Sequence, residues 1–169
     1  MPVRDALTRL VADGALALSE NRTIRVPNMP DERLTELFEI RSSLEGLATE
    51  HATPNLTTAA IARAKELIET MHGALKSKDY DTYIQSHYSF HFTIYAAANR
   101  PTLLGIIEIL WLQVGPWFRP GIERGNIVLR DPNEHHRELA GALRARDAER
   151  ARKVIEKTST SAPSFYAPA

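Results

Sequence analysis

The chain has 169 residues, of which 43% are hydrophobic and 25% are charged, so it is long enough for one ordinary domain with a core of its own. Lys and Arg together number 21, as do Asp and Glu, and this balance excludes a strongly basic nucleic-acid coat protein but not a local basic patch. The absence of cysteine excludes a disulfide scaffold, a thiolate zinc site and a cysteine nucleophile.

The sequence shows neither a membrane span nor a signal peptide. No uninterrupted apolar run approaches the roughly 18 residues that a spanning helix needs. The N-terminus carries charges where a signal peptide would need an apolar stretch. We therefore expect a cytoplasmic protein that does not insert into a membrane.

The first thirty residues predict a helix followed by a β-hairpin. Pro2 suits the start of a helix, and apolar residues then recur at helical spacing as far as Gly14. Two short alternating runs, residues 15–18 and 23–26, predict the hairpin. The two prolines in residues 27–30 predict a linker, because neither element continues through them.

From residue 31 onward the sequence predicts helices and no strand. The main body is therefore expected to be an all-α helical bundle, and the tail 161–169 is expected to be frayed and flexible. The expected helices run from Asp31 to about His51, from Asn55 or Thr57 to about Lys76, from Asp79 or Asp81 to about Asn99, from Pro101 with interruptions at 115–116 and 120–121, from Asp131, and from about Asp147 to Thr160.

Three histidines lie on helix faces that should point into the core. His87 and His91 are four residues apart on one apolar face, so both imidazoles can reach one ion. His136 shares a face with Leu139 and other apolar residues of a later helix. Its neighbour His135 is rotated by about 100° around that helix and is the poorer candidate.

Two interpretations of these histidines remain open. A histidine on an apolar face is more often a hydrogen-bonded core residue than a metal ligand. Three of them on the inward faces of two helices would, however, each need a separate partner in the low-dielectric interior. One shared cation satisfies all three, so the pattern favours a metal site formed by His87, His91 and His136.

Arg41 is the other polar residue on an apolar face, and Glu45 follows it by one helical turn. In one interpretation the two form an intrahelical pair at the edge of the core, with the guanidinium reaching outward. In the other, Arg41 is a fixed cation that faces a cavity and holds a carboxylate in a bidentate grip. The residues alone do not favour either.

Three separated segments resemble, in order, the effector-binding (FCD) domain of FadR-type regulators in the GntR family. They are residues 37–45 with Arg41, residues 80–99 with His91 and Asn99, and residues 134–147 with His136. The resemblance covers about residues 31–160. It implies an antiparallel bundle of six to seven helices that binds a small carboxylate effector at or near a metal, with Arg41, Thr158 and Asn99 at the effector site.

The metal site of that family normally consists of one aspartate and three histidines. His91 and His136 stand at two of the histidine positions, His87 stands at the aspartate position, and Thr158 stands at the third histidine position. Exchanging aspartate for histidine removes a negative charge and favours Zn²⁺ or Ni²⁺ over Mn²⁺. Exchanging histidine for threonine loses a ligand, because a neutral hydroxyl coordinates weakly, and leaves a three-nitrogen site with an open position.

The N-terminal segment is similar to part of the family's winged helix-turn-helix. Residues 1–26 resemble its recognition helix and wing, followed by the linker 27–30, and the resemblance implies that Arg4 contacts DNA. The helices that precede the recognition helix in the family are absent, and the wing tip 20–22 lacks the usual glycine. A truncated chain, a misassigned start and a loss of operator binding are the three explanations.

These observations lead to an expected function and two alternatives. The leading interpretation is a ligand-responsive, homodimeric transcriptional regulator whose effector modulates operator binding. One alternative is a metal-dependent enzyme on a helical bundle. His87 and His91 have the spacing of zinc-protease ligands, but Tyr88 follows the first in place of the glutamate base. The other is a sensor that has lost DNA binding and acts through protein partners.

Overall fold

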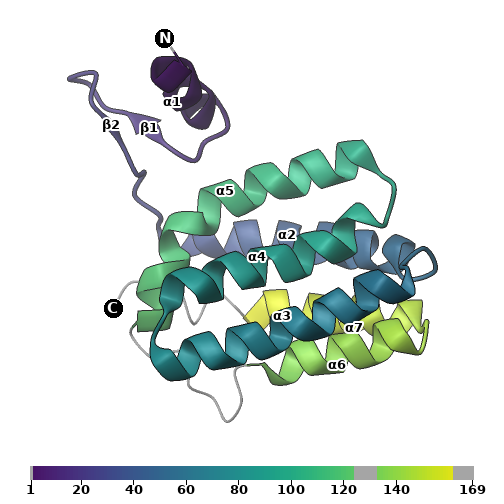
Figure 1. Ribbon diagram of the computed structural model, residues 1–169. Coiled ribbons are helices and arrows are strands. Elements are labelled where there is room, and N and C mark those ends of the chain that lie inside the picture. Colours follow the sequence, from purple (N-terminus) through teal and green to yellow (C-terminus); the bar gives the residue numbers. More distant parts are fainter. Residues whose placement is uncertain (1, 124–132, 162–169) are drawn as a thin grey trace.

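The structure is a computed structural model that describes residues 2–123 and 133–161. Within these residues the chain forms seven helices and one two-stranded sheet (Figure 1). The helices are α1 (Pro2–Ala12), α2 (Asp31–Ala52), α3 (Thr58–Ser77), α4 (Tyr80–Ala96), α5 (Pro101–Glu123), α6 (Glu134–Arg144) and α7 (Ala148–Ser161), and the strands are β1 (Ala17–Leu18) and β2 (Ile24–Arg25).

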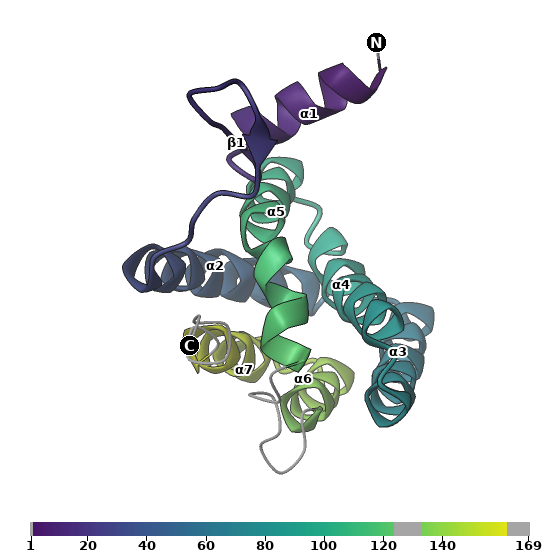
Figure 2. The same cartoon turned by 90° about the vertical axis from the view of Figure 1, so that its left-hand side faces the viewer.

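Helices α2 to α7 form a bundle, and α1 with the hairpin lies outside it (Figures 1 and 2). Helix α2 packs against α7, α3 packs against α4, and α6 contacts both α7 and α3. Helix α5 lies against α2 and α4. The prediction of an all-helical main body preceded by a helix and a hairpin is therefore confirmed, and the hairpin is antiparallel with Leu18 opposite Ile24.

Two polar side chains decide between alternative helix starts that the sequence left open. The Thr57 hydroxyl accepts a hydrogen bond from the backbone N–H of Ala60 and caps α3. The Asp79 carboxylate accepts one from the N–H of Thr82 and caps α4. Each cap satisfies a backbone donor that the first helical turn leaves without a partner. The start expected at Asp131 lies outside the described residues, as do positions 162–169 of the tail.

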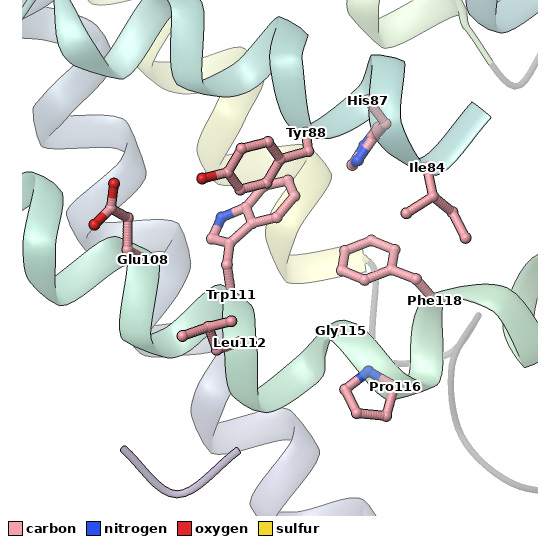
Figure 3. A pocket seen from close by; sticks show the side chains of 9 residues that line it. All are labelled: Ile84, His87, Tyr88, Glu108, Trp111, Leu112, Gly115, Pro116 and Phe118. Carbon is pink, nitrogen blue, oxygen red and sulfur yellow. The ribbon is translucent and has the colours of Figure 1, made fainter. Parts of the chain in front are cut away.

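Helix α5 corrects one prediction about the chain. Interruptions were expected at 115–116 and 120–121, but the helix continues to Glu123 with Pro116 and Pro120 inside it. Figure 3 shows α5 changing direction near Gly115 and Pro116, where the missing proline N–H and its ring disturb the hydrogen-bond ladder. Buried residues on both sides, including Val114 and Phe118, hold the bent helix against the bundle.

The sequence was expected to contain no segment long and apolar enough to span a membrane, and helix α5 changes this expectation. Among the described residues it is the one helix long and apolar enough to cross a membrane by length and composition alone. Its buried side chains, such as Ile107 and Trp111, belong to the same core as those of α2 and α4. Packing in the bundle accounts for only part of this apolar composition, because 28% of the apolar window is buried and Ile106, Ile109 and Leu112 are exposed.

The N-terminal helix is attached to the bundle through its C-terminal end. No residue of α1 is buried, whereas Ala15 just after it is. The side chain of Gln113 on α5 donates a hydrogen bond to the carbonyl of Asp13 at 3.0 Å. Gly14 has a φ of 74°, and a Cβ there would lie 3.2 Å from the Gln113 amide nitrogen. The end of α1 predicted at Gly14 thus has both a conformational and a steric reason.

Candidate metal and ligand site

Three imidazoles from two helices converge inside the bundle. His87 and His91 come from α4 and His136 comes from α6, and one ring nitrogen of each lies within 4.8 Å of the others. Their ring centroids are 4.6 Å apart for His87 and His91, and 5.2 Å apart for His87 and His136. His136 is fully buried and His91 is 5% exposed, while His87 is partly buried.

A hydrogen-bond chain determines which nitrogen of His91 is available as a ligand. The Tyr95 hydroxyl donates its proton to Glu45 Oε2 at 2.8 Å. The same hydroxyl oxygen lies 3.0 Å from His91 Nδ1. Because its proton is already used, the oxygen must accept from His91, which places the imidazole proton on Nδ1. The lone pair of His91 is therefore on Nε2.

His136 is oriented in the same way by Asn133. The side-chain oxygen of Asn133, which can only accept, lies 3.2 Å from His136 Nδ1. The proton of His136 is therefore on Nδ1 and its lone pair is on Nε2. Metal-binding histidines in proteins are commonly held by such a partner on the second nitrogen.

Burial keeps these histidines neutral. It lowers the pKa of His87 to about 3, with the nearby His135 and Arg41 adding to the effect. Burial also lowers the pKa of His91 and of His136 well below the ordinary value, and neighbouring imidazoles contribute. A neutral imidazole is the form that ligates a metal. The donor set, all nitrogen and uncharged, fits a borderline divalent ion such as Zn²⁺ or Ni²⁺.

Arg41 and Glu45 form an ion pair in the core. Arg41 Nε lies 2.7 Å from Glu45 Oε1, and the two residues are 3% and 1% exposed. Glu45 also accepts hydrogen bonds from Trp111 Nε1 at 2.7 Å and from the Tyr95 hydroxyl. The intrahelical pairing weighed from the sequence is therefore present, but the guanidinium points inward instead of reaching outward to solvent.

The guanidinium of Arg41 is stacked among aromatic rings. Its central carbon lies 4.5 Å from the Trp111 ring centroid and 4.8 Å from that of Phe38. Such contacts stabilise a desolvated cation. Within the described part of the chain, Arg41 Nη1 is buried and has no hydrogen-bond partner. The arrangement thus contains one donor that a ligand or water could still satisfy.

A pocket of about 560 Å³ lies between α4 and α5 and reaches the histidine cluster at His87. Figure 3 shows His87 pointing from α4 toward α5, with Trp111 and Phe118 facing it. The lining is mainly aromatic and aliphatic, and its one carboxylate belongs to Glu108. Its residues are Ile84, His87, Tyr88, Glu108, Trp111, Leu112, Gly115, Pro116 and Phe118.

The other predicted site residues do not line this pocket. The partly buried Thr158 donates its hydroxyl proton to the carbonyl of Val154, one turn back in α7. Asn99 is exposed at the turn after α4 with a φ of 53°, eight residues, or about 12 Å of helix, beyond His91. Arg4 is exposed on α1.

Three residues at the site were not selected from the sequence. Tyr95 lies four residues after His91, so the helical period could have placed it on the same face. Trp111 donates to Glu45 from another helix, and no local sequence pattern predicts that contact. His135 was considered the poorer candidate, yet its Nε2 lies 3.2 Å from His136 Nε2.

Comparisons with known proteins agree with this architecture. A family profile described as the FCD domain matches residues 36–158. The HTH-type transcriptional regulator McbR of Escherichia coli is 36% identical over 155 residues, which cover 91% of this chain and 70% of McbR. A probable D-xylose utilization operon transcriptional repressor of Paenarthrobacter nicotinovorans is 30% identical over 154 residues, covering 91% of this chain and 67% of the repressor.

Solved structures show the same fold. The structure of E. coli McbR/YncC superposes with a TM-score of 0.81 at 30% identity, covering 95% of this chain and 82% of that one. A GntR-family regulator from Pseudomonas syringae gives a TM-score of 0.69 at 20% identity, covering 98% of this chain and 68% of that one, which supports the fold alone. Because the FCD match spans most of the sequence and the curated relatives regulate transcription and are not enzymes, this chain belongs to the GntR family as a FadR-type regulator with an FCD domain.

Proposed function

We propose that residues 31–160 form a metal-dependent sensor that binds a small organic acid and thereby modulates operator binding by the N-terminal segment 1–26. The observation that carries this proposal is the convergence of three neutral imidazoles beside an aromatic pocket. His87, His91 and His136 would hold the ion. The ion would act as a Lewis acid that attracts the carboxylate, and the protein would supply the orientation and the apolar surroundings.

The charge distribution in the pocket suggests how the acid is oriented. The histidine cluster lies at the His87 end, whereas Glu108 contributes a negative charge elsewhere in the lining. Like charges repel, so the carboxylate of the effector should lie at the His87 end, away from the exposed Glu108. Trp111 and Phe118 would then contact the apolar body of the effector.

Arg41 supports the carboxylate in this proposal through its charge rather than through a bidentate grip. Its Nε is already engaged by Glu45, and its buried Nη1 has no hydrogen-bond partner in the described part of the chain. Thr158 and Asn99 are proposed as effector contacts on the family resemblance alone, since neither lines the pocket.

The experiment that tests the metal proposal starts with the protein as purified. Elemental analysis should find a divalent metal, and mass spectrometry of the denatured protein should identify any organic acid carried with it. Metal-stripped wild type should bind Zn²⁺ or Ni²⁺, and His91→Ala should weaken that binding by more than the roughly 10–100-fold typical of outer-shell changes. A wild type that binds neither ion would refute a metal-dependent sensor.

We propose that DNA binding involves Arg4 and a homodimer, because operator symmetry commonly mirrors the two-fold symmetry of the regulator. Such a regulator would act in the cytoplasm, where its operator lies. Genomic fragments selected by binding to the protein provide the DNA probe. If Arg4 contacts a phosphate, Arg4→Ala should weaken binding and reduce the salt dependence by about one charge. Absence of any selected fragment would favour a sensor that acts through protein partners.

A further inference from the structure

His135 precedes His136 on α6, and its ring turns toward the histidine cluster and contacts His136. Its ring lies against that of His136, with the centroids 3.9 Å apart and the ring planes tilted by 42°. His135 Nε2 lies 3.2 Å from His136 Nε2. A positive charge on His135 would also lower the pKa values of His87 and His91. The ring nitrogens that lie within 4.8 Å of one another belong to His87, His91 and His136, so His135 adjoins the cluster through His136.

The distance between the two Nε2 atoms matches that between two ligands of one ion. Two imidazole nitrogens bound at about 2.1 Å with tetrahedral angles lie about 3.4 Å apart. The observed 3.2 Å differs from this by only a few tenths of an ångström. The ligand nitrogens of His87, His91 and His136 lie within 4.8 Å of one another. Binding one ion would require side-chain rotations that shorten these distances and bring His135 within reach of His87 and His91.

The contact between the two nitrogens needs either a proton or a cation. Asn133 fixes the His136 proton on Nδ1, so His136 Nε2 presents a lone pair toward His135. Two lone pairs facing each other would repel. Without an ion, His135 Nε2 must therefore donate a proton to His136. When an ion takes the lone pair of His136, that hydrogen bond is lost, and His135 can move its proton to Nδ1.

We propose that His135 is the fourth nitrogen ligand, so that the metal is held by four imidazoles, two from α4 and two consecutive ones from α6. This inference rests on the metal site proposed above. A fourth protein ligand would close a tetrahedral shell. An effector carboxylate would then have to expand the shell to five ligands or displace His135, which would couple effector binding to the start of α6.

Metal titrations of the metal-stripped full chain test this assignment. Wild type, His135→Ala, His135→Gln and the matched control His72→Ala, whose histidine lies on α3 outside the cluster, are each titrated with Zn²⁺ against a chelator. Removal of a ligand should weaken Zn²⁺ binding by more than about 100-fold, beyond the 10–100-fold that an outer-shell partner costs. The control should bind as wild type does.

Co²⁺ provides a second measurement that does not depend on affinity. Tetrahedral Co²⁺ absorbs visible light strongly, and replacing a nitrogen by water changes the position and intensity of these bands. We expect a changed Co²⁺ spectrum for both His135 variants. X-ray absorption of the Zn²⁺ form should count four imidazoles in wild type and three in His135→Ala. Circular dichroism of the metal-free variants shows whether each is folded, and His135→Gln keeps a polar side chain should His135→Ala fail to fold.

The outcomes separate this inference from the proposed function. If wild type binds Zn²⁺, His91→Ala does not, and the His135 variants keep the wild-type Co²⁺ spectrum, His135 is only a hydrogen-bond partner and the inference is refuted. A loss of about 10–100-fold with an unchanged spectrum leads to the same conclusion. If wild type binds neither Zn²⁺ nor Co²⁺, the metal proposal itself is wrong and this inference with it.

Discussion

The ion pair in the core should make Glu45 one of the most sensitive positions of the chain. The residue is 1% exposed, and its carboxylate accepts three hydrogen bonds, from Arg41, Tyr95 and Trp111. Replacing Glu45 by Gln keeps the shape but leaves the Arg41 cation buried without a counter-charge. Removing one partner of a buried pair typically costs about 3–5 kcal/mol. Since whole domains have a free energy of unfolding of about 5–15 kcal/mol, Glu45→Gln should remove a large part of it.

Urea denaturation of the metal-free protein, monitored by circular dichroism, measures this loss in the free energy of unfolding. Glu50→Gln is the matched control, because Glu50 pairs with Arg152 at 2.7 Å but both side chains are 40% exposed. An exposed pair of this kind contributes about 0–1 kcal/mol. The double variant Arg41→Met with Glu45→Gln should regain stability relative to Glu45→Gln, since no unpaired charge remains. Equal losses for Glu45→Gln and Glu50→Gln would refute the reasoning.

Three further changes test other parts of the site. The metal-free protein should lose stability as the pH falls from about 6.5 to about 4, because the unfolded chain protonates its histidines there while burial keeps the pKa of His87 at about 3 and that of His135 at about 4. Each such histidine contributes up to about 1.4 kcal/mol per pH unit to the free energy of unfolding. His135→Ala should therefore reduce the slope of this free energy against pH, as measured by urea titration at several pH values. An unchanged slope would contradict this. Tyr95→Phe should weaken Zn²⁺ binding by about 10–100-fold in chelator competition, because His91 Nδ1 loses its acceptor; wild-type affinity would show that the tautomer is fixed in another way. Thr158→His should tighten Zn²⁺ binding more in the His135→Ala background than in wild type, and no gain in either background would show that position 158 does not face the ion.

The sequence predicted the helices well because their signals are local. Periodic apolar residues and the caps Thr57 and Asp79 depend on neighbours within one or two turns. The continuity of α5 was missed, because whether a proline ends a helix or only bends it depends on packing by residues such as Val114. That is a tertiary effect which no window of sequence contains.

The same distinction applies to the site. The helical angles of His87, His91 and His136 placed them on inward faces, and the structure brings these rings together. His135 was judged by its angle on the helix, but a side chain at the first turn of α6 can turn its ring toward a neighbour. The environment of Arg41 could not be foreseen, because Trp111 lies 70 positions further along the chain.

The placement of Trp111 gives the protein an optical reporter of its own state. The chain has two tryptophans. The indole N–H of Trp111 donates to a carboxylate, a guanidinium lies over its ring, and the ring lines the aromatic pocket. Indole emission responds to nearby charge and to the polarity of its surroundings. The intrinsic fluorescence of the unlabelled chain therefore offers a direct way to follow ligand binding in this pocket. Trp117→Phe would remove the emission of the second tryptophan.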